Sequence, residues 1–190
     1  VAAREVSLAD LKEMKDHVDI EIESFVHGSM CISYSGRCLL SNYMTGNRDA
    51  NRGQCSQSCR WKYSLVESNR PGEYYPIEED EHGTYIFNSK DLCLIHRIPD
   101  LYEAGIDSLK IEGRMKSVHY VATVAKVYRT AIDTYLKEGK DWYVRPEWIE
   151  ELEKISHRPY TDGFAEGRPD ESAQNYGKST NRQSHDFIGL

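Results

Sequence analysis

The stretch SLKIEGRMKSVHYVATVAKVYRTAIDTYLKEG, residues 108–139, decides the fold class. It opens with a short apolar run that ends at Gly113, which is the pattern of a buried strand. The remainder ends at Gly139, a residue type that often closes helices, and it carries apolar side chains at helical spacing, namely Val121, Val124, Ala125, Tyr128, Ile132 and Tyr135. The stretch therefore predicts a strand followed by a long amphipathic helix that packs on a core.

The same pattern of helices and strands occurs upstream. Residues 7–18, SLADLKEMKDHV, predict a helix with Ser7 as N-cap and Asp10 at the capping-box position. Residues 20–28, IEIESFVHG, alternate apolar and polar side chains and predict the next strand. Strands that alternate with helices indicate a parallel sheet. We interpret the fold as α/β, the C-terminal part of a truncated TIM-like (β/α) barrel.

Further elements are predicted downstream. Residues 90–105 predict a helix that Ser89 caps and Gly105 closes, and a short helix is expected near residues 146–155. Residues 61–67 and 83–89 predict a hairpin around an exposed acidic loop. The first residue is not Met, and we expect the chain to be part of a longer protein. The expected domains are barrel β/α units over 1–28 and 84–140, a cysteine-rich metal-binding insertion over 29–83, and a C-terminal extension over 141–190 that leads to a domain outside this sequence.

The composition is that of an ordinary globular chain, with 39% hydrophobic and 29% charged residues. No apolar run approaches the roughly 18 residues that a membrane-spanning helix needs, so we expect no membrane contact and a cytoplasmic location. A net charge of -7 argues against a protein that coats nucleic acid uniformly. Between Ser24 and Val66, however, Asp49 is the only acidic residue, and this segment is locally cationic.

The cysteines indicate a metal site. There are five of them, and four fall within residues 31–59, so an odd and clustered set favours metal binding in a reducing compartment over disulfides. Thiolates are soft ligands that suit iron–sulfur clusters or zinc. Only Cys55 and Cys59 have the close spacing of a zinc knuckle. The spacing of the cysteines therefore favours an iron–sulfur cluster, and zinc is the alternative.

Three stretches resemble the collagenase-like peptidases of family U32. They are ESFVHGSMCISYSGRCLLSNY at 23–43, NRGQCSQSCRWKY at 51–63 and SLKIEGRMKS at 108–117. Despite the family's name, several members are implicated in oxygen-independent hydroxylation of tRNA wobble uridine, ribosomal RNA cytidine or ubiquinone precursors. Residues 41–63 are most similar to the tRNA branch, which uses prephenate. The resemblance therefore implies tRNA as partner and prephenate, or a similar small anion, as oxygen donor.

The resemblance also implies a 4Fe-4S cluster. In the cluster-bearing members the ligands lie at intervals close to those of Cys31, Cys38, Cys55 and Cys93, and we carry the ligand role onto these four. Zinc could take the place of iron in aerobic preparations. Cys59 is then a free thiol or a neighbour of the cluster, and an exchange of roles between Cys55 and Cys59 stays open.

Candidate catalytic residues follow two predicted strands. We expect Glu23 and His27 near the carboxyl end of one strand, where the active sites of α/β barrels form, and both can handle protons. Glu112, Arg114 and Lys116 follow another strand and offer a carboxylate and two cations to an anionic substrate. Structural ion pairs, or for His27 a hydrogen bond beside the cluster, are the alternative roles.

The cysteine-rich segment also carries the residue types that bind single-stranded RNA, which are cations and stackable rings: Arg48, Arg52, Arg60, Lys62, Tyr34, Tyr43 and Trp61. The expected function is hydroxylation of tRNA wobble uridine. One alternative is a collagenase-like peptidase, although the sequence holds neither an HExxH nor a GxSxG motif. The other is a non-catalytic metal module that presents a basic face to RNA.

Overall fold

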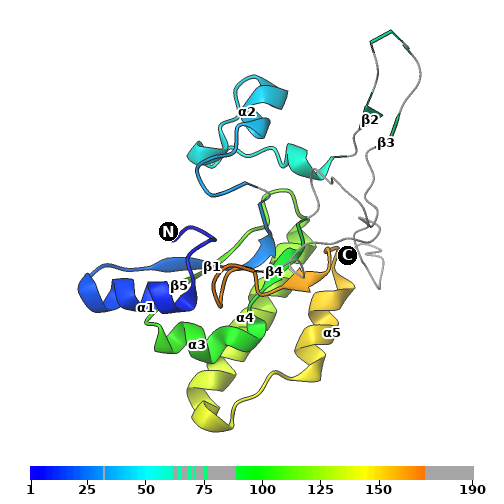
Figure 1. Ribbon diagram of the computed structural model, residues 1–190. Helices are drawn as coiled ribbons and strands as arrows, with labels where there is room; N and C mark the ends of the chain where they lie inside the picture. The colour runs from blue at the N-terminus through cyan, green and yellow to red at the C-terminus, as the bar shows by residue number, and fades with distance from the viewer. Residues whose placement is uncertain are drawn as a thin grey trace. The chain divides into compact units, whose positions relative to one another are not determined.

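The computed structural model describes residues 1–31, 33–61, 64–65, 68–69, 71, 75–76 and 89–169. The chain divides into two compact units (Figure 1). Within the described residues, unit 1 comprises 1–30 and 90–169, and unit 2 comprises the described part of 31–89. Each unit is considered by itself.

Unit 1 is built around a four-stranded sheet with the order β5-β1-β4-β6 (Figure 1). The strands are β1 (Glu23–Ser29), β4 (Asp91–Cys93), β5 (Ser108–Ile111) and β6 (Tyr160–Thr161). β1 runs parallel to β5 but antiparallel to β4, and β4 runs parallel to β6. The α/β class is therefore confirmed, whereas the expectation of a wholly parallel sheet is wrong. The truncated barrel stays a prediction.

The predicted helix over 90–105 is wrong in its first half. Asp91–Cys93 is a buried strand, a short 3₁₀ turn follows at Ile95–Arg97, and helix α3 spans only Ile98–Glu103. Pro99 explains the late start, because a proline lacks the backbone N–H of a helix interior and is accepted only in the first turn. Cys93 is therefore a strand residue and not a helix residue.

Three other helices have the predicted positions. Helix α1 (Leu8–His17) begins at Ser7, whose hydroxyl accepts the Asp10 N–H at 3.1 Å while the Asp10 carboxylate accepts the Ser7 N–H at 3.2 Å. Helix α4 (Val118–Glu138) ends at Gly139, and helix α5 covers Pro146–Lys154. The local signals of cap, period and closing glycine were sufficient for these elements.

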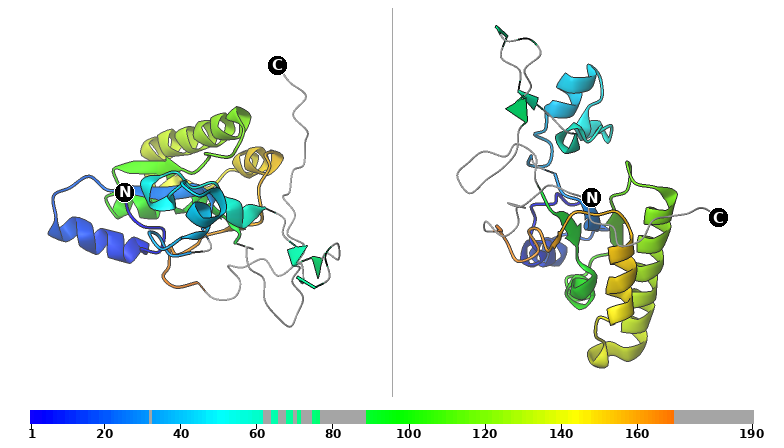
Figure 2. Two further views of the ribbon diagram at one scale, coloured as in Figure 1. Left: turned by 90° about the horizontal axis from the view of Figure 1, so that it is seen from above. Right: turned by 90° about the vertical axis from the view of Figure 1, so that its right-hand side faces the viewer.

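The core of unit 1 lies between the sheet and helices α3, α4 and α5 (Figures 1 and 2). Helix α4 turns one side to it, with these residues buried: Tyr120, Thr123, Val124, Val127, Tyr128 and Ala131. The predicted stripe is correct at Val124 and Tyr128. It is wrong at Val121, which is 40% exposed, and at Ala125, which is exposed. No helix in the described part of the chain is both long and apolar enough to cross a membrane.

Unit 2 contains helix α2 (Leu40–Thr45), 3₁₀ turns at Ala50–Arg52 and Ser58–Arg60, and the short strands β2 (Ser64–Leu65) and β3 (Tyr75–Pro76). β2 lies within the predicted strand 61–67, but it pairs antiparallel with β3, which lies in the stretch predicted to be the loop, so that part of the prediction is wrong. The second predicted strand of the hairpin, 83–89, falls outside the described residues except for Ser89.

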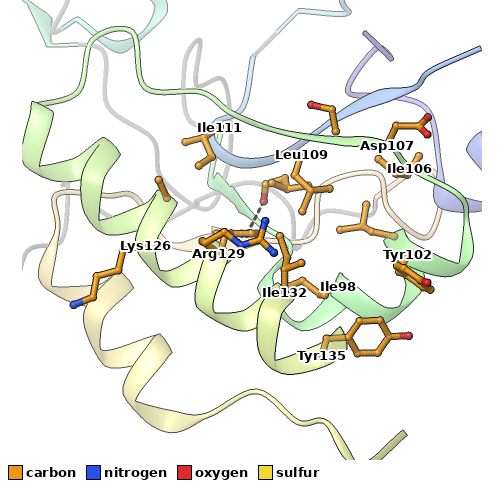
Figure 3. Close-up of a pocket in the computed structure, with 15 residues that line it drawn as sticks. Ile98, Tyr102, Ile106, Asp107, Leu109, Ile111, Lys126, Arg129, Ile132 and Tyr135 are labelled. Atoms are coloured by element: carbon orange, nitrogen blue, oxygen red, sulfur yellow. Dashed lines mark hydrogen bonds between the residues drawn. The ribbon is translucent and has the colours of Figure 1, made fainter. Parts of the chain in front are cut away.

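A cavity of about 770 Å³ lies in unit 1 between the sheet and helices α3 and α4 (Figure 3). Leu109 and Ile111 of β5, Ile98 of α3 and Ile132 of α4 give it a largely apolar lining. None of the predicted catalytic residues lines it. The predicted residues lie beside the cavity, at the carboxyl end of β1, and Val26 and Tyr128 belong to both the cavity lining and this region.

Candidate functional site

His27 is the centre of a buried polar cluster at the carboxyl end of β1. It is 1% exposed and pairs directly with Cys93 of β4. Its backbone oxygen accepts the Glu112 N–H at 2.8 Å, so the ends of the parallel strands β1 and β5 meet beside it. The Nε2 atom of His27 is buried and has no hydrogen-bond partner in the described part of the chain. A buried polar atom is nearly always paired, so this nitrogen marks a place for a ligand or a water.

Asp91 and Lys116 supply opposite charges beside His27. Asp91 is fully buried on β4, and its Oδ2 lies 3.4 Å from Lys116 Nζ and 3.2 Å from the backbone nitrogen of Arg158. Lys116 Nζ also donates to the backbone oxygen of Ser156 at 2.9 Å. Breaking such a buried pair leaves a charge without compensation, which costs about 3–5 kcal/mol. The pair therefore fixes both side chains next to His27.

Aromatic rings enclose the imidazole of His27. The rings of Tyr120, Tyr128 and Tyr160 lie 6.0, 5.5 and 5.3 Å from it. Tyr160 is stacked at 4.1 Å on His157, whose Nδ1 lies 2.6 Å from the backbone oxygen of Arg158. Burial lowers the pKa of His157 and raises that of Tyr128. The imidazole of His27 is thus buried among aromatic rings.

Burial also lowers the pKa of His27 from 6.5 to about 3, although the nearby Asp91 opposes the change. The folded chain therefore holds a neutral imidazole, whereas the unfolded chain takes up a proton near pH 6.5. The stability that this provides is complete above pH 6.5 and is lost as the pH falls towards 3. From neutral pH to about pH 5 the loss is about 2 kcal/mol.

The expected result is that wild type loses about 2 kcal/mol more than His27→Asn between pH 7 and about pH 5, as measured by urea unfolding. The amide nitrogen of Asn can take the place of Nδ1, and other acid-sensitive groups, including His157, remain in both proteins. Parallel stability curves for the two proteins would contradict a neutral, buried His27.

Glu23 is not part of this cluster. The expectation that it lies near the carboxyl end of its strand is wrong, because β1 begins at Glu23 and the cluster lies at its other end. Its carboxylate lies 2.6 Å from Lys110 Nζ and accepts the Ser108 hydroxyl at 2.8 Å. The bond to Lys110 holds the pKa of Glu23 below its usual value. The structure places Glu23 in an ion pair that joins β1 to β5, and a catalytic role for it stays untested.

The loop after β5 carries three predicted catalytic residues, Glu112, Arg114 and Lys116, and only two of them lie near His27. Glu112 follows β5 directly, and its side chain accepts the Arg114 N–H at 3.1 Å. Lys116 reaches the cluster through Asp91, and its charge acts on His27. Arg114 is exposed. His27, Glu112 and Lys116 are therefore neighbours.

The sequence analysis missed the partners that complete the cluster: Asp91, Tyr128, His157, Arg158 and Tyr160. Asp91 was placed in a helix, and Tyr128 was assigned to the core only. The segment 157–160 has no periodicity, and of its residues only Tyr160, in β6, pairs with β4. Its one available signal was a histidine and an arginine next to a proline and a tyrosine, which is too common a combination to identify a site.

Unit 2 holds four of the five thiols, and none of the five cysteines is in a disulfide. Burial raises the pKa of Cys59 to about 11, and Cys31, Cys55 and Cys38 are near enough for their charges to raise it further. Gln57 has a left-handed φ of 54° and donates its backbone N–H to Cys55 Sγ at 3.3 Å. In the described part of the chain no group of three or more His, Cys, Asp or Glu side chains has the arrangement of a metal site.

The cation-rich surface of unit 2 carries exposed rings. Tyr34 and Tyr43 are 63% and 83% exposed, and Trp61 is 47% exposed. Arg48 and Arg52 are also exposed, while Lys62 lies outside the described residues. A buried serine anchors this surface, because Ser41 Oγ donates to the backbone oxygen of Arg48 at 2.9 Å. Unit 2 thus offers rings and cations to a polyanion.

Comparison with known proteins identifies the family. The model of peptidase family U32 matches residues 1–175. The chain belongs to peptidase family U32. This U32 chain has no match among solved structures.

Several curated relatives of the U32 chain are named for tRNA hydroxylation. It is 50% identical over 190 residues to the tRNA hydroxylation protein P1 of Bacillus subtilis (strain 168), which covers 100% of this chain and 44% of that protein. It is 40% identical over 216 residues to the tRNA hydroxylation protein P of Escherichia coli (strain K12), covering 93% and 47%. A collagenase of Porphyromonas gingivalis is 37% identical over 165 residues, covering 86% and 44%. The chain thus spans less than half the length of these relatives.

Proposed function

We propose that this chain is the part of a tRNA-modifying enzyme that hydroxylates the wobble uridine without molecular oxygen, in the cytoplasm, with prephenate or a similar small anion as donor. The observation that carries the proposal is the 50% identity, over the whole chain, to a protein named for tRNA hydroxylation. The buried cluster around His27, with its unpartnered nitrogen, supports a reaction site in this chain. In the complete enzyme the sheet would form part of a TIM-like barrel.

A 4Fe-4S cluster is proposed as the cofactor. The donor chemistry fits, because Cys31, Cys38 and Cys55 are thiols close enough to Cys59 to raise its pKa, and Cys55 already accepts a backbone N–H. Cys31, Cys38, Cys55 and Cys93 would hold the cluster, and Cys59 would remain a free neighbour. When bound, the cluster would supply redox or Lewis-acid chemistry to the donor. Zinc in the same thiols is the alternative for protein purified in air.

The residues of unit 1 bind the donor and exclude water. Lys116, which is paired with Asp91, would share its charge with a carboxylate of the donor beside His27, and the surrounding tyrosines would keep solvent out. In the reaction a hydroxyl group passes from a carbon of the donor to a carbon of uridine, and the hydrogen displaced from uridine goes to the donor. The uridine carbon is oxidised and the donor carbon is reduced by the same two electrons, so no outside oxidant is needed.

The cation-rich surface of unit 2 is the proposed RNA contact, which gives a prediction on salt dependence. Arg52→Gln should weaken tRNA binding more at low salt than at high salt, because each phosphate contact acts through counterion release. The slope of log affinity against log salt should fall in magnitude by about 0.7–0.9 for one lost contact. Lys140→Gln, at an exposed turn of unit 1, is the matched control. Equal slopes for Arg52→Gln and wild type would argue against this surface.

A peptidase remains the second candidate, because a relative is named collagenase. The two functions separate in one genetic experiment. Cells that lack the gene are complemented with the wild type or with His27→Asn, and the hydroxylation of their tRNA is measured. The two purified proteins are then assayed for cleavage of gelatin. Hydroxylated tRNA only with wild type, and no cleavage by either protein, is the expected result. Cleavage without any change in tRNA would favour the peptidase, and tRNA binding without either activity would favour a non-catalytic RNA-binding metal module.

A further inference from the structure

The hydroxyl group of Tyr128 joins three parts of the buried cluster. From helix α4 it reaches the sheet, where it lies 2.8 Å from the backbone oxygen of Val26 and 3.0 Å from the backbone nitrogen of Leu94. It also lies 3.4 Å from Nδ1 of His27 and forms a hydrogen bond with the side chain of Cys93. A phenol has one proton to donate, so these contacts restrict one another.

The distances decide where that proton lies. The Leu94 N–H can only donate, so the Tyr128 oxygen accepts from it. The separation of 2.8 Å to the Val26 oxygen is that of a normal O–H···O bond, whereas 3.4 Å to His27 is long for a hydroxyl donor. The proton therefore goes to the Val26 oxygen, and Nδ1 of His27 faces a lone pair of the hydroxyl oxygen.

We propose that Tyr128 holds His27 in the tautomer that carries its hydrogen on Nδ1, so that Nε2 presents a lone pair to the hydroxyl group of the small-molecule donor. Tyr128 is thus a positioning residue, and His27 is the group that touches the ligand. The identity of this ligand rests on the proposed function. The tautomer is a property of the chain itself and is measured independently.

Two buried atoms point to a hydroxyl group on the ligand. His27 Nε2 and Ser29 Oγ have no partner in the described residues, and they lie two positions apart on β1. The first is an acceptor in this tautomer and the second can donate or accept, which suits a hydroxyl group.

Nitrogen-15 NMR of the histidine side chains tests this proposal on the 190-residue chain. A nitrogen that carries hydrogen and one that presents a lone pair resonate in separate regions, so each tautomer is read directly. His157 is an internal standard, because its Nδ1 donates to the Arg158 oxygen without help from Tyr128. We expect both histidines to carry hydrogen on Nδ1. A hydrogen on Nε2 of His27 would overturn the proposal, and this wild-type spectrum decides it even if a variant fails to fold.

The role of Tyr128 is tested by Tyr128→Phe, which should leave His27 as a mixture of tautomers with averaged shifts and His157 unchanged. Tyr160→Phe is the matched control, since it also removes a hydroxyl from a ring beside His27, but one that donates to the Leu152 oxygen. An unchanged His27 tautomer in Tyr128→Phe would overturn the positioning role.

Prephenate is the probe for the ligand. Its addition to wild type should shift the His27 Nε2 resonance towards that of a hydrogen-bonded acceptor. An unchanged resonance at saturating prephenate, with the Nδ1–H tautomer intact, would overturn the acceptor role of Nε2. If the shift occurs and tRNA is nevertheless not hydroxylated, the proposed function fails while this inference stands.

Discussion

Replacement of Cys93 by Ala is expected to abolish iron binding in protein purified without oxygen. Cys93 is buried and 6% exposed on β4, in unit 1, whereas the other proposed ligands belong to unit 2. Loss of one of four thiolates leaves an iron site open, and such clusters depend on all their ligands. The measurement is the iron content together with the absorbance of the thiolate-to-iron bands, and both should fall to background.

Cys59→Ser is the matched control for this experiment. It removes a neighbouring thiol and should leave iron content and absorbance intact. Full loss of iron in Cys59→Ser with retention in Cys55→Ser would reverse the assignment of these two residues. Stoichiometric zinc without iron in anaerobic wild type would contradict the cluster itself.

Gly28→Ala is expected to destabilise the fold by about 3–5 kcal/mol, because it adds a steric clash to backbone strain. Gly28 has a φ of +111°, and a Cβ there would lie 2.1 Å from the backbone oxygen of Glu112. This close approach of β1 to the end of β5 is what sets His27 beside Glu112. Urea unfolding measures the change, and the loss of His27 tautomer order should accompany it.

Gly167→Ala separates the two causes. Gly167 has a similar φ of +107°, but a Cβ there meets nothing within 4 Å. The substitution should therefore cost only the strain, about 1–2 kcal/mol. Equal destabilisation by both substitutions would show that the approach of β1 to Glu112 does not matter.

The sequence was informative where the physical cause is local. The capping box of Ser7 and Asp10 and the period of α4 lie within single elements, and both helices were correctly predicted. Cys93 lies in the short apolar run 92–95, and such a run fits a helix or a strand equally well. Pro99 was the only signal in favour of the strand. A proline fits only the first turn of a helix, so the helix begins near Pro99 and leaves the preceding residues to a strand.

The candidate site was predictable only in part for the same reason. His27 lies near the end of a strand and Lys116 follows one, and these positions alone made them candidates. Their partners come from distant segments, since Asp91 faces β1 across the sheet and Tyr128 reaches it from the middle of α4. Glu23 was a candidate for the same reason, but its strand begins later than predicted. Glu23 is therefore at the amino end of β1, away from the cluster. Pairing between distant segments leaves no periodic pattern in the sequence.

The measurement that tests the account most directly is the transfer of labelled oxygen to tRNA. The protein is purified without oxygen and incubated with unhydroxylated tRNA and prephenate that carries a heavy oxygen isotope in its hydroxyl group. The tRNA is digested to nucleosides, which are analysed by mass spectrometry. The account predicts a hydroxylated wobble uridine that contains the heavy isotope, in wild type and Cys59→Ser but not in Cys93→Ala. Unmodified uridine with iron-loaded wild type, or hydroxylated uridine without the label, would contradict it.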